Sequence, residues 1–205
     1  MRIAFIGHNE FGKVTLEAFL ARGDQVAGVF CAPEKPGDKP DAVRVAAQEH
    51  GLPLFQFSSL RKEEAEQAMH GLDADIGVMA YVLQFAPQRF VCIPRHGTIQ
   101  YHPSLLPRHR GIAAIEWTIR EGDPIAGGSI YHLADRMDAG AIAAQEWVFV
   151  KKGETARELW ERALAPLGQK LLGEVIDYAK VHNTLPAKPQ DEQFATLAPS
   201  LDAKH

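Results

Sequence analysis

The sequence predicts an α/β protein with a doubly wound, mostly parallel, Rossmann-like sheet and helices on both of its faces. Short apolar segments rich in β-forming residues alternate with segments of helical periodicity, and turns rich in glycine and proline separate them. Parallel neighbouring strands need crossover connections, and the helices of those connections cover the sheet.

The first half of the chain carries this alternation most clearly. Residues 2–6 form an apolar strand that runs into a glycine-containing turn, after which Val14, Leu16 and Phe19 recur at helical spacing. The same pattern then repeats, with strands predicted over 25–31, 52–57, 76–80 and 97–101 and helices over 41–50, 62–69 and 87–90.

The later chain changes character. Residues 126–133 and 141–150 predict two strands joined by a short turn, which is typical of an antiparallel edge. A long apolar-faced helix is expected over 154–180, with a kink at Pro166 and Gly168. We expect a single catalytic domain over residues 1–181, with a tail over 182–205 that packs on it or frays.

Composition excludes several classes of function. The 22 Lys and Arg residues against 26 Asp and Glu residues give a net charge of -4, which offers no broad positive field for nucleic acid. No apolar run approaches the roughly 20 residues that span a bilayer, so we expect a cytoplasmic protein without membrane contact. Cys31 and Cys92 lack metal-like spacing, and we predict neither a metal nor a disulfide framework.

Two glycine-containing segments deserve separate interpretation. The pattern at residues 7–12 is G-x-x-x-x-G, which lacks both the dinucleotide fingerprint and the Lys-Ser/Thr of a P-loop, so we interpret it as a tight strand-to-helix turn.

Residues 100–111, QYHPSLLPRHRG, directly follow a predicted strand. Ligands of α/β proteins collect beyond the carboxyl ends of strands, so the polar residues of this stretch are candidates for a site.

The stretch 100–111 resembles the signature loop of the tetrahydrofolate-dependent formyltransferases. Its sequence is especially similar to that of the N-terminal hydrolase domain of 10-formyltetrahydrofolate dehydrogenase. Residues 2–7, 26–30 and 77–85 are similar to that domain and to methionyl-tRNA formyltransferase, and residues 113–122 and 137–140 also align. The resemblance extends over about residues 1 to 200 and implies the formyltransferase fold.

The resemblance implies a set of site residues. His102 and Asp138 correspond to the catalytic pair of the family, whereas Gln100 stands where the transferases have an Asn. The donor 10-formyltetrahydrofolate is expected to contact two segments: Met79, Ala80, Tyr81, Val82, Leu83, Gln84 and Phe85, and Leu133, Ala134, Asp135 and Met137. Ser104, Leu105, Arg110 and Gly111 are the candidates for substrate binding; His96, His109 and His132 are interpreted as surface or supporting residues.

The residue types suit formyl transfer on chemical grounds. Transfer to an amine passes through a tetrahedral oxyanion and requires the attacking nitrogen to lose a proton. A neutral His102 accepts a proton, and a neighbouring carboxylate from Asp138 raises its pKa and orients its ring. For Asp138 alone, the residues Met-Asp-Ala-Gly are equally ordinary in a turn.

Three functions compete at this point. The first is transfer of a formyl group from 10-formyltetrahydrofolate to a small amine, the second is hydrolysis of the same donor to formate, and the third is folate binding without turnover. Retention of both His102 and Asp138 disfavours the third. We do not expect tRNA as acceptor, because the net charge is negative and the sequence ends at His205, without residues for the C-terminal barrel of methionyl-tRNA formyltransferases.

Overall fold

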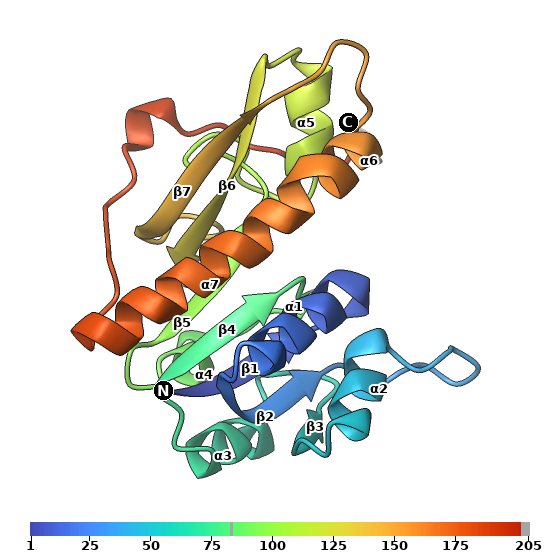
Figure 1. The fold of residues 1–205 in the computed structure, drawn as a ribbon, viewed down its shortest axis with the longest axis vertical. Helices are drawn as coiled ribbons and strands as arrows, with labels where there is room; N and C mark the ends of the chain where they lie inside the picture. Colours follow the sequence, from blue (N-terminus) through green and yellow to red (C-terminus); the bar gives the residue numbers. More distant parts are fainter. Residues whose placement is uncertain (83, 202–205) are drawn as a thin grey trace. The chain divides into compact units, whose positions relative to one another are not determined.

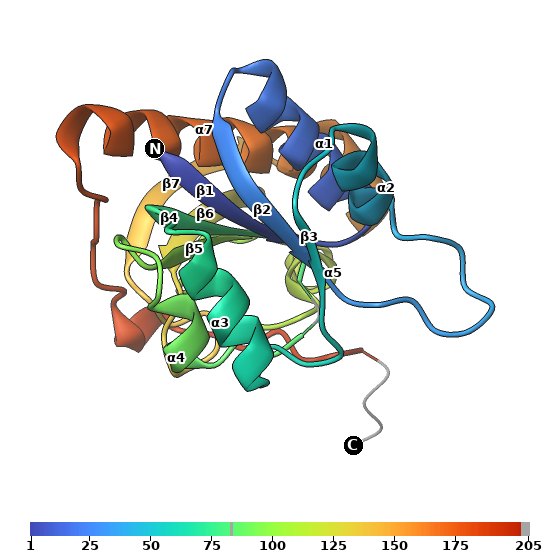
Figure 2. The same ribbon diagram turned by 90° about the horizontal axis from the view of Figure 1, so that it is seen from below.

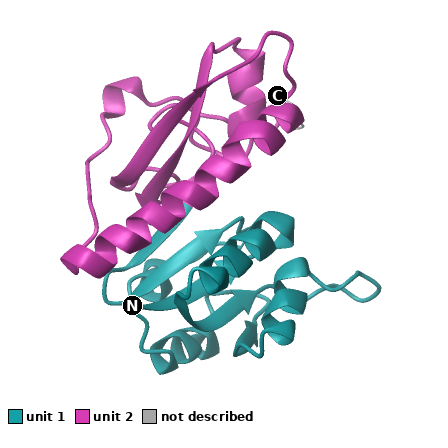
Figure 3. Cartoon of the chain, in the orientation of Figure 1, with its two compact units in different colours: residues 1–100 teal, residues 101–205 magenta. Residues whose placement is uncertain are grey.

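The computed structural model describes residues 1–82 and 84–201, and the chain forms two compact units, Met1–Gln100 and Tyr101–His205 (Figure 3). The expected single domain over 1–181 and its tail remain a prediction.

Unit 1 is built on a parallel sheet in the strand order β3-β2-β1-β4-β5. Its strands are β1 (Arg2–Gly7), β2 (Gln25–Cys31), β3 (Leu54–Gln56), β4 (Ile76–Ala80) and β5 (Thr98–His102), of which the last two residues of β5 belong to unit 2. The central strands are buried on both faces, as the apolar run Ile3 to Ile6, with no exposed side chain, illustrates. The predicted parallel sheet is confirmed.

Helices cover both faces of this sheet, with α1 and α2 on one side and α3 and α4 on the other (Figure 2). Their bounds are α1 (Asn9–Ala21), α2 (Ala42–Glu49), α3 (Glu63–Gly71) and α4 (Gln88–Val91). The packing of α1 on the sheet includes an edge-to-face contact between Phe5 and Phe19, whose ring centroids lie 6.2 Å apart. The doubly wound arrangement is therefore confirmed, with boundaries that differ from the predicted ones by a few residues.

Unit 2 contains an antiparallel hairpin of β6 (Ile125–His132) and β7 (Ile142–Phe149), and its strand order is β5-β6-β7. The register places Ser129 opposite Gln145. The short helix α5 (Ala114–Arg120) precedes the hairpin. The predicted antiparallel edge is confirmed.

The long helical segment is not one continuous helix. It consists of α6 (Ala156–Leu159), a π-helical turn (Trp160–Leu164) and α7 (Ala165–His182), which runs along the hairpin (Figure 1). The interruption lies before Pro166, because a proline cannot donate the backbone hydrogen bond that an α-helix requires there. The hydroxyl of Tyr101 donates to the carbonyl of Leu164 at 2.7 Å, which satisfies one acceptor at the irregular turn.

Gly168 does not interrupt α7, contrary to the expected kink at this residue. A Cβ atom at this position would lie 2.5 Å from the ring of Tyr101, so the glycine allows the helix to approach the strand that carries His102.

Within the described part of the tail, residues 188–198 form backbone hydrogen bonds with other segments of unit 2. Ile142 and Lys188 exchange two backbone hydrogen bonds, and the backbone of Arg110 donates to Thr196 and accepts from Ala198. Residues 188–198 therefore lie beside both segments that carry the predicted catalytic pair. Among the described residues, no helix is both long enough and apolar enough to span a bilayer.

Candidate active site

The site in unit 2 begins with His102, the last residue of β5, whose side chain is buried. Its Nε2 lies 2.8 Å from the carbonyl oxygen of His109. Because a carbonyl oxygen only accepts, Nε2 carries the hydrogen and donates it. In the neutral ring, Nδ1 is then the nitrogen with a free lone pair, which makes it the atom that can take a proton.

Asp138 faces this nitrogen from the turn between β6 and β7. Its Oδ2 lies 3.7 Å from His102 Nδ1, close enough for a strong electrostatic interaction but longer than a good hydrogen bond. The same Oδ2 accepts from the backbone N–H of Gly111 at 2.8 Å, and Oδ1 accepts from the hydroxyl of Tyr131 at 2.7 Å. Two donors thus fix the direction of the carboxylate.

The backbone supports this placement at some conformational cost. Asp138 has a φ of 52°, in the left-handed region that residues other than glycine seldom adopt, although Asp and Asn tolerate it better than most. Gly111 has a φ of 131°, and a Cβ there would lie 2.5 Å from the carbonyl oxygen of Ala198. Only glycine brings its N–H to Asp138 under these constraints.

Two opposing effects set the charge of His102. Burial lowers its pKa below the ordinary value, while the negative charge of Asp138 and the hydrogen bond to His109 act in the opposite direction. The ring is therefore neutral near pH 7 and can act as a base. Burial and the charge of Asp138 raise the pKa of Tyr131 well above its ordinary value, so its hydroxyl remains a donor.

The loop after His102 is held by its own polar groups. Ser104 donates to the carbonyl of Arg108 at 2.6 Å, and its own carbonyl accepts from the hydroxyl of Ser129 at 2.6 Å. Leu105 lies over Gly127, beside a surface hollow. The predicted substrate-binding roles of Ser104, Leu105, Arg110 and Gly111 remain predictions, although three of these residues, Ser104, Arg110 and Gly111, already have protein partners.

Arg110 is buried, and its guanidinium binds the tail. It donates to Gln190 Oε1 at 2.7 Å and 3.1 Å, and to the carboxylate of Glu192 at 2.8 Å and 3.1 Å. An arginine here can either bind a carboxylate of a ligand or fix the loop. These contacts support the role of fixing the loop.

His109 is not a surface residue, because only 2% of it is exposed. Its Nε2 lies 2.8 Å from Asp123 Oδ2, and Asp123 also accepts two hydrogen bonds from Arg108, at 2.7 Å and 2.8 Å. Together with Glu121, His109 and Asp123 form the kind of cluster that can hold a metal ion. The guanidinium of Arg108, which bonds to both carboxylates, already supplies a cation there.

Sequence reasoning missed Tyr131, Gln190 and the pair of His109 and Asp123. Tyr131 lies on β6 as an aromatic residue in an apolar strand and gives no sign of a polar task. Gln190 comes from a polar segment 52 residues beyond Asp138, a separation over which no local pattern can be recognised. For His109, its position in the same loop as His102 was the one sequence feature that could have indicated a role in the site.

The predicted folate-binding segment 79–85 belongs to unit 1. Met79 and Ala80 end β4 and are buried, Tyr81 follows with a left-handed φ of 58°, and Phe85 is exposed beneath the guanidinium of Arg61. Val82 is half-buried, and Gln84 donates to the carbonyl of Phe57 at 2.8 Å. Leu83 lies outside the described residues.

The other predicted residues are distributed between the units. Gln100 is the last residue of unit 1 and precedes His102 by two positions on β5, so both side chains leave the strand on the same face. In unit 2, Leu133 is half-buried, whereas Ala134, Asp135 and Met137 are exposed in the turn before Asp138. Their roles toward the folate remain predictions.

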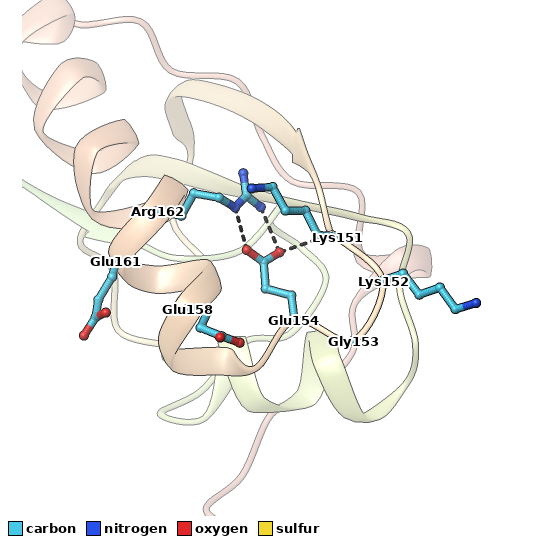
Figure 4. Close-up of a pocket in the computed structure, with 7 residues that line it drawn as sticks. All are labelled: Lys151, Lys152, Gly153, Glu154, Glu158, Glu161 and Arg162. Carbon is cyan, nitrogen blue, oxygen red and sulfur yellow. Dashed lines mark hydrogen bonds and ion pairs between the residues drawn. The ribbon is translucent and has the colours of Figure 1, made fainter.

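A hollow of about 570 Å³ lies elsewhere in unit 2, beside α6, and its lining contains none of the predicted site residues (Figure 4). Two of its charged side chains, Glu154 and Arg162, form an ion pair. Glu154 accepts from Arg162 at 2.5 Å and 2.8 Å, and these hydrogen bonds lower the pKa of Glu154 to about 2. The pair of buried His102 and partly buried Asp138 is the better candidate site, because a histidine whose pKa is perturbed beside a carboxylate is typical of functional sites.

The fold is a doubly wound α/β fold, and buried His102 at the end of β5, with the partly buried carboxylate of Asp138 beside it, forms a candidate acid–base site. A model of the formyl transferase family matches residues 1–176, and the chain belongs to this family. This confirms the resemblance drawn from residues 100–111.

Individual relatives agree with this assignment. The chain is 37% identical over 201 residues to mitochondrial 10-formyltetrahydrofolate dehydrogenase of Mus musculus, an alignment that covers 96% of this chain and 22% of that protein. It is 32% identical over 207 residues to methionyl-tRNA formyltransferase of Thermotoga neapolitana, covering 98% and 65%. The chain thus spans about a fifth of the length of the dehydrogenase.

The fold is shared with solved structures of more distant sequence. An N-formyltransferase of Helicobacter canadensis, in complex with folinic acid and dTDP-3-aminofucose, matches with a TM-score of 0.79 and 17% identity, covering 98% of this chain and 72% of that one. At this identity the match establishes the fold.

The burial of His102 and its position beside Asp138 predict how the His102 ring titrates. We expect the His102 ring to titrate below the ordinary value of 6.5, with Nε2 protonated in the neutral form. In Asp138→Asn the pKa falls further, because the negative charge that stabilises the imidazolium is lost. Long-range ¹H–¹⁵N spectra of the histidine rings across pH measure both quantities. A His102 pKa above 6.5, or one that rises in Asp138→Asn, would contradict this account of the site.

Proposed function

We propose that this chain transfers the formyl group of 10-formyltetrahydrofolate to a small amine, with His102 as the base. The observation that carries the proposal is the buried His102, whose Nε2 is engaged by His109 and whose free Nδ1 faces Asp138 Oδ2 at 3.7 Å. Membership of the formyl transferase family supports it. The name of the dehydrogenase relatives supports 10-formyltetrahydrofolate as the donor.

The reaction can be written around Nδ1. The amine nitrogen attacks the formyl carbon, and a tetrahedral oxyanion forms. His102 Nδ1 takes the proton that the amine loses, and Asp138 stabilises the resulting imidazolium. Collapse of the oxyanion breaks the bond to the folate nitrogen, which leaves with a proton from His102. The products are the formylated amine and tetrahydrofolate.

The remaining roles follow from residue type and position. The amide of Gln100 leaves β5 on the same face as His102, so we assign it to the oxyanion as donor. The segment 79–85 is proposed to offer backbone groups and apolar side chains to the flat pterin ring. Leu133, Ala134, Asp135 and Met137 are proposed as further folate contacts.

Hydrolysis of the same donor is the second candidate, and Gln100 is the observation that favours it. In the transferases this position holds an Asn, and the longer side chain moves the amide donor by about 1.5 Å, a scale of misplacement that can reduce a rate by about a hundredfold. If water replaces the amine, the same steps release formate and tetrahydrofolate.

His102→Ala and Asp138→Asn each lower turnover by about a hundredfold or more, because each removes part of the proton transfer. Asn is chosen at 138 because it tolerates the left-handed backbone. Formation of tetrahydrofolate and release of formate from 10-formyltetrahydrofolate, with and without candidate amines, are the measurements. The controls are His50→Ala and Asp38→Ala, which replace exposed residues.

Binding is measured separately with 5-formyltetrahydrofolate, a folate whose formyl group is not transferred. It raises the melting temperature of the wild type and of both variants, since ligand binding to the native state stabilises it. Near wild-type turnover in either variant would remove the assigned roles, and no stabilisation of the wild type at saturating folate would remove the folate site.

Replacement of Gln100 distinguishes transfer of the formyl group from hydrolysis. Gln100→Asn raises the ratio of formylated amine to free formate at one fixed amine concentration, because the shorter amide lies where the transferases place their donor. Gln67→Asn, on the exposed surface of α3, is the control for a Gln-to-Asn change far from the reaction. A lower ratio in Gln100→Asn would mean that Gln100 is the donor suited to the acceptor of this protein.

A further inference from the structure

The tail segment that passes the site contains a side chain with an unusual set of partners. The amide of Gln190 is half-buried and makes four hydrogen bonds, which is its full capacity. Its Oε1 accepts from Arg110 Nε at 3.1 Å and from Arg110 Nη2 at 2.7 Å. Its Nε2 donates to the carbonyls of Asp138 at 2.8 Å and Gly140 at 2.7 Å.

These bonds join the two segments that carry the catalytic pair. Arg110 belongs to the loop that follows His102, while Asp138 and Gly140 belong to the turn between β6 and β7. One planar amide bridges them, so a shift of either segment must break at least one of the four bonds. Three turn residues, 138–140, are thereby fixed relative to the loop.

The turn needs such support because its backbone is strained. The left-handed φ of 52° at Asp138 is sparsely populated for residues other than glycine and persists only when the surroundings determine it. Gly111 and Tyr131 hold the carboxylate of Asp138, but neither bonds to its backbone carbonyl. Gln190 donates a hydrogen bond to this carbonyl.

A second bridge runs through Glu192 but contributes less. Its carboxylate binds Arg110 and Arg136, and the side chains of Glu192 and Arg136 are 52% and 70% exposed. Water and salt screen exposed ion pairs strongly. The half-buried amide of Gln190 is the more effective of the two connections.

We propose that Gln190 is a positioning residue, which sets the distance between His102 and Asp138 by tying the Asp138 turn to the Arg110 loop. The inference rests on the proposed function for its effect on rate. Its effect on the His102–Asp138 pair does not depend on any activity.

The test uses Gln190→Met, which keeps the length of the side chain and removes all four hydrogen bonds. The matched control is Gln193→Met, because Gln193 is exposed and its side chain binds only the neighbouring Asp191 in the bonds described. Gln190→Asn is the conservative variant, whose shorter amide reaches one segment but not both. Circular dichroism and urea unfolding check that each variant is folded, and Gln190→Asn decides the test if Gln190→Met does not fold.

For Gln190→Met we expect kcat to fall about tenfold or more, since small misplacements of reacting groups have effects of this size, while KM for 10-formyltetrahydrofolate stays within about twofold. In ¹⁵N spectra the pKa of His102 falls, because Asp138 is less well held beside it. Gln190→Asn shows smaller changes in the same direction, and Gln193→Met matches the wild type.

An unchanged His102 titration in the folded Gln190 variants overturns the proposal, whatever their rates. A fall in kcat without that change in titration also overturns it, because the effect would then arise elsewhere. If the wild type consumes no 10-formyltetrahydrofolate, the proposed function fails, and the titration alone decides the role of Gln190.

Discussion

The carboxylate of Asp138 is the group on which the candidate site of unit 2 depends. It accepts hydrogen bonds from Gly111 and Tyr131 and faces Nδ1 of His102, so the loop after β5, the strand β6 and the turn before β7 all meet at one side chain. A partly buried charge is tolerated there because these donors replace the water that it loses. Without it, the N–H of Gly111 and the hydroxyl of Tyr131 would lack this acceptor.

The same arrangement determines which nitrogen of His102 reacts. The carbonyl of His109 engages Nε2 and leaves Nδ1 toward the carboxylate. Burial keeps the ring neutral and therefore able to accept a proton, while Asp138 limits the fall in pKa and stabilises the cation that forms. A base of this kind does its work by accepting a proton and returning it, as formyl transfer and hydrolysis both require.

Much of unit 1 could be predicted because its strands are apolar and its helices have regular periodicity, and the antiparallel hairpin could be predicted because turn residues separate two β-rich segments. The site roles of His102 and Asp138 were predicted from the resemblance of their loop and turn to the formyltransferases, and they remain predictions. An irregularity at Pro166 could be predicted from the proline itself, but its form, a π-helical turn whose Leu164 carbonyl accepts from Tyr101, involves a partner far away in sequence. Gln190 was missed for the same reason: its four bonds are tertiary, and a polar tail gives no periodic signal.

The central claim is that His102 and Asp138 act as one catalytic unit, and a double-mutant cycle tests it most directly. The kcat/KM values for 10-formyltetrahydrofolate are measured for the wild type, His102→Ala, Asp138→Asn and the double variant. Asp138 is assigned to act through His102, so removing it from a protein that already lacks the imidazole should cost little further. The account predicts that the double variant is about as active as His102→Ala alone. Losses that multiply, so that the double variant is lower by the product of the two single effects, would contradict it.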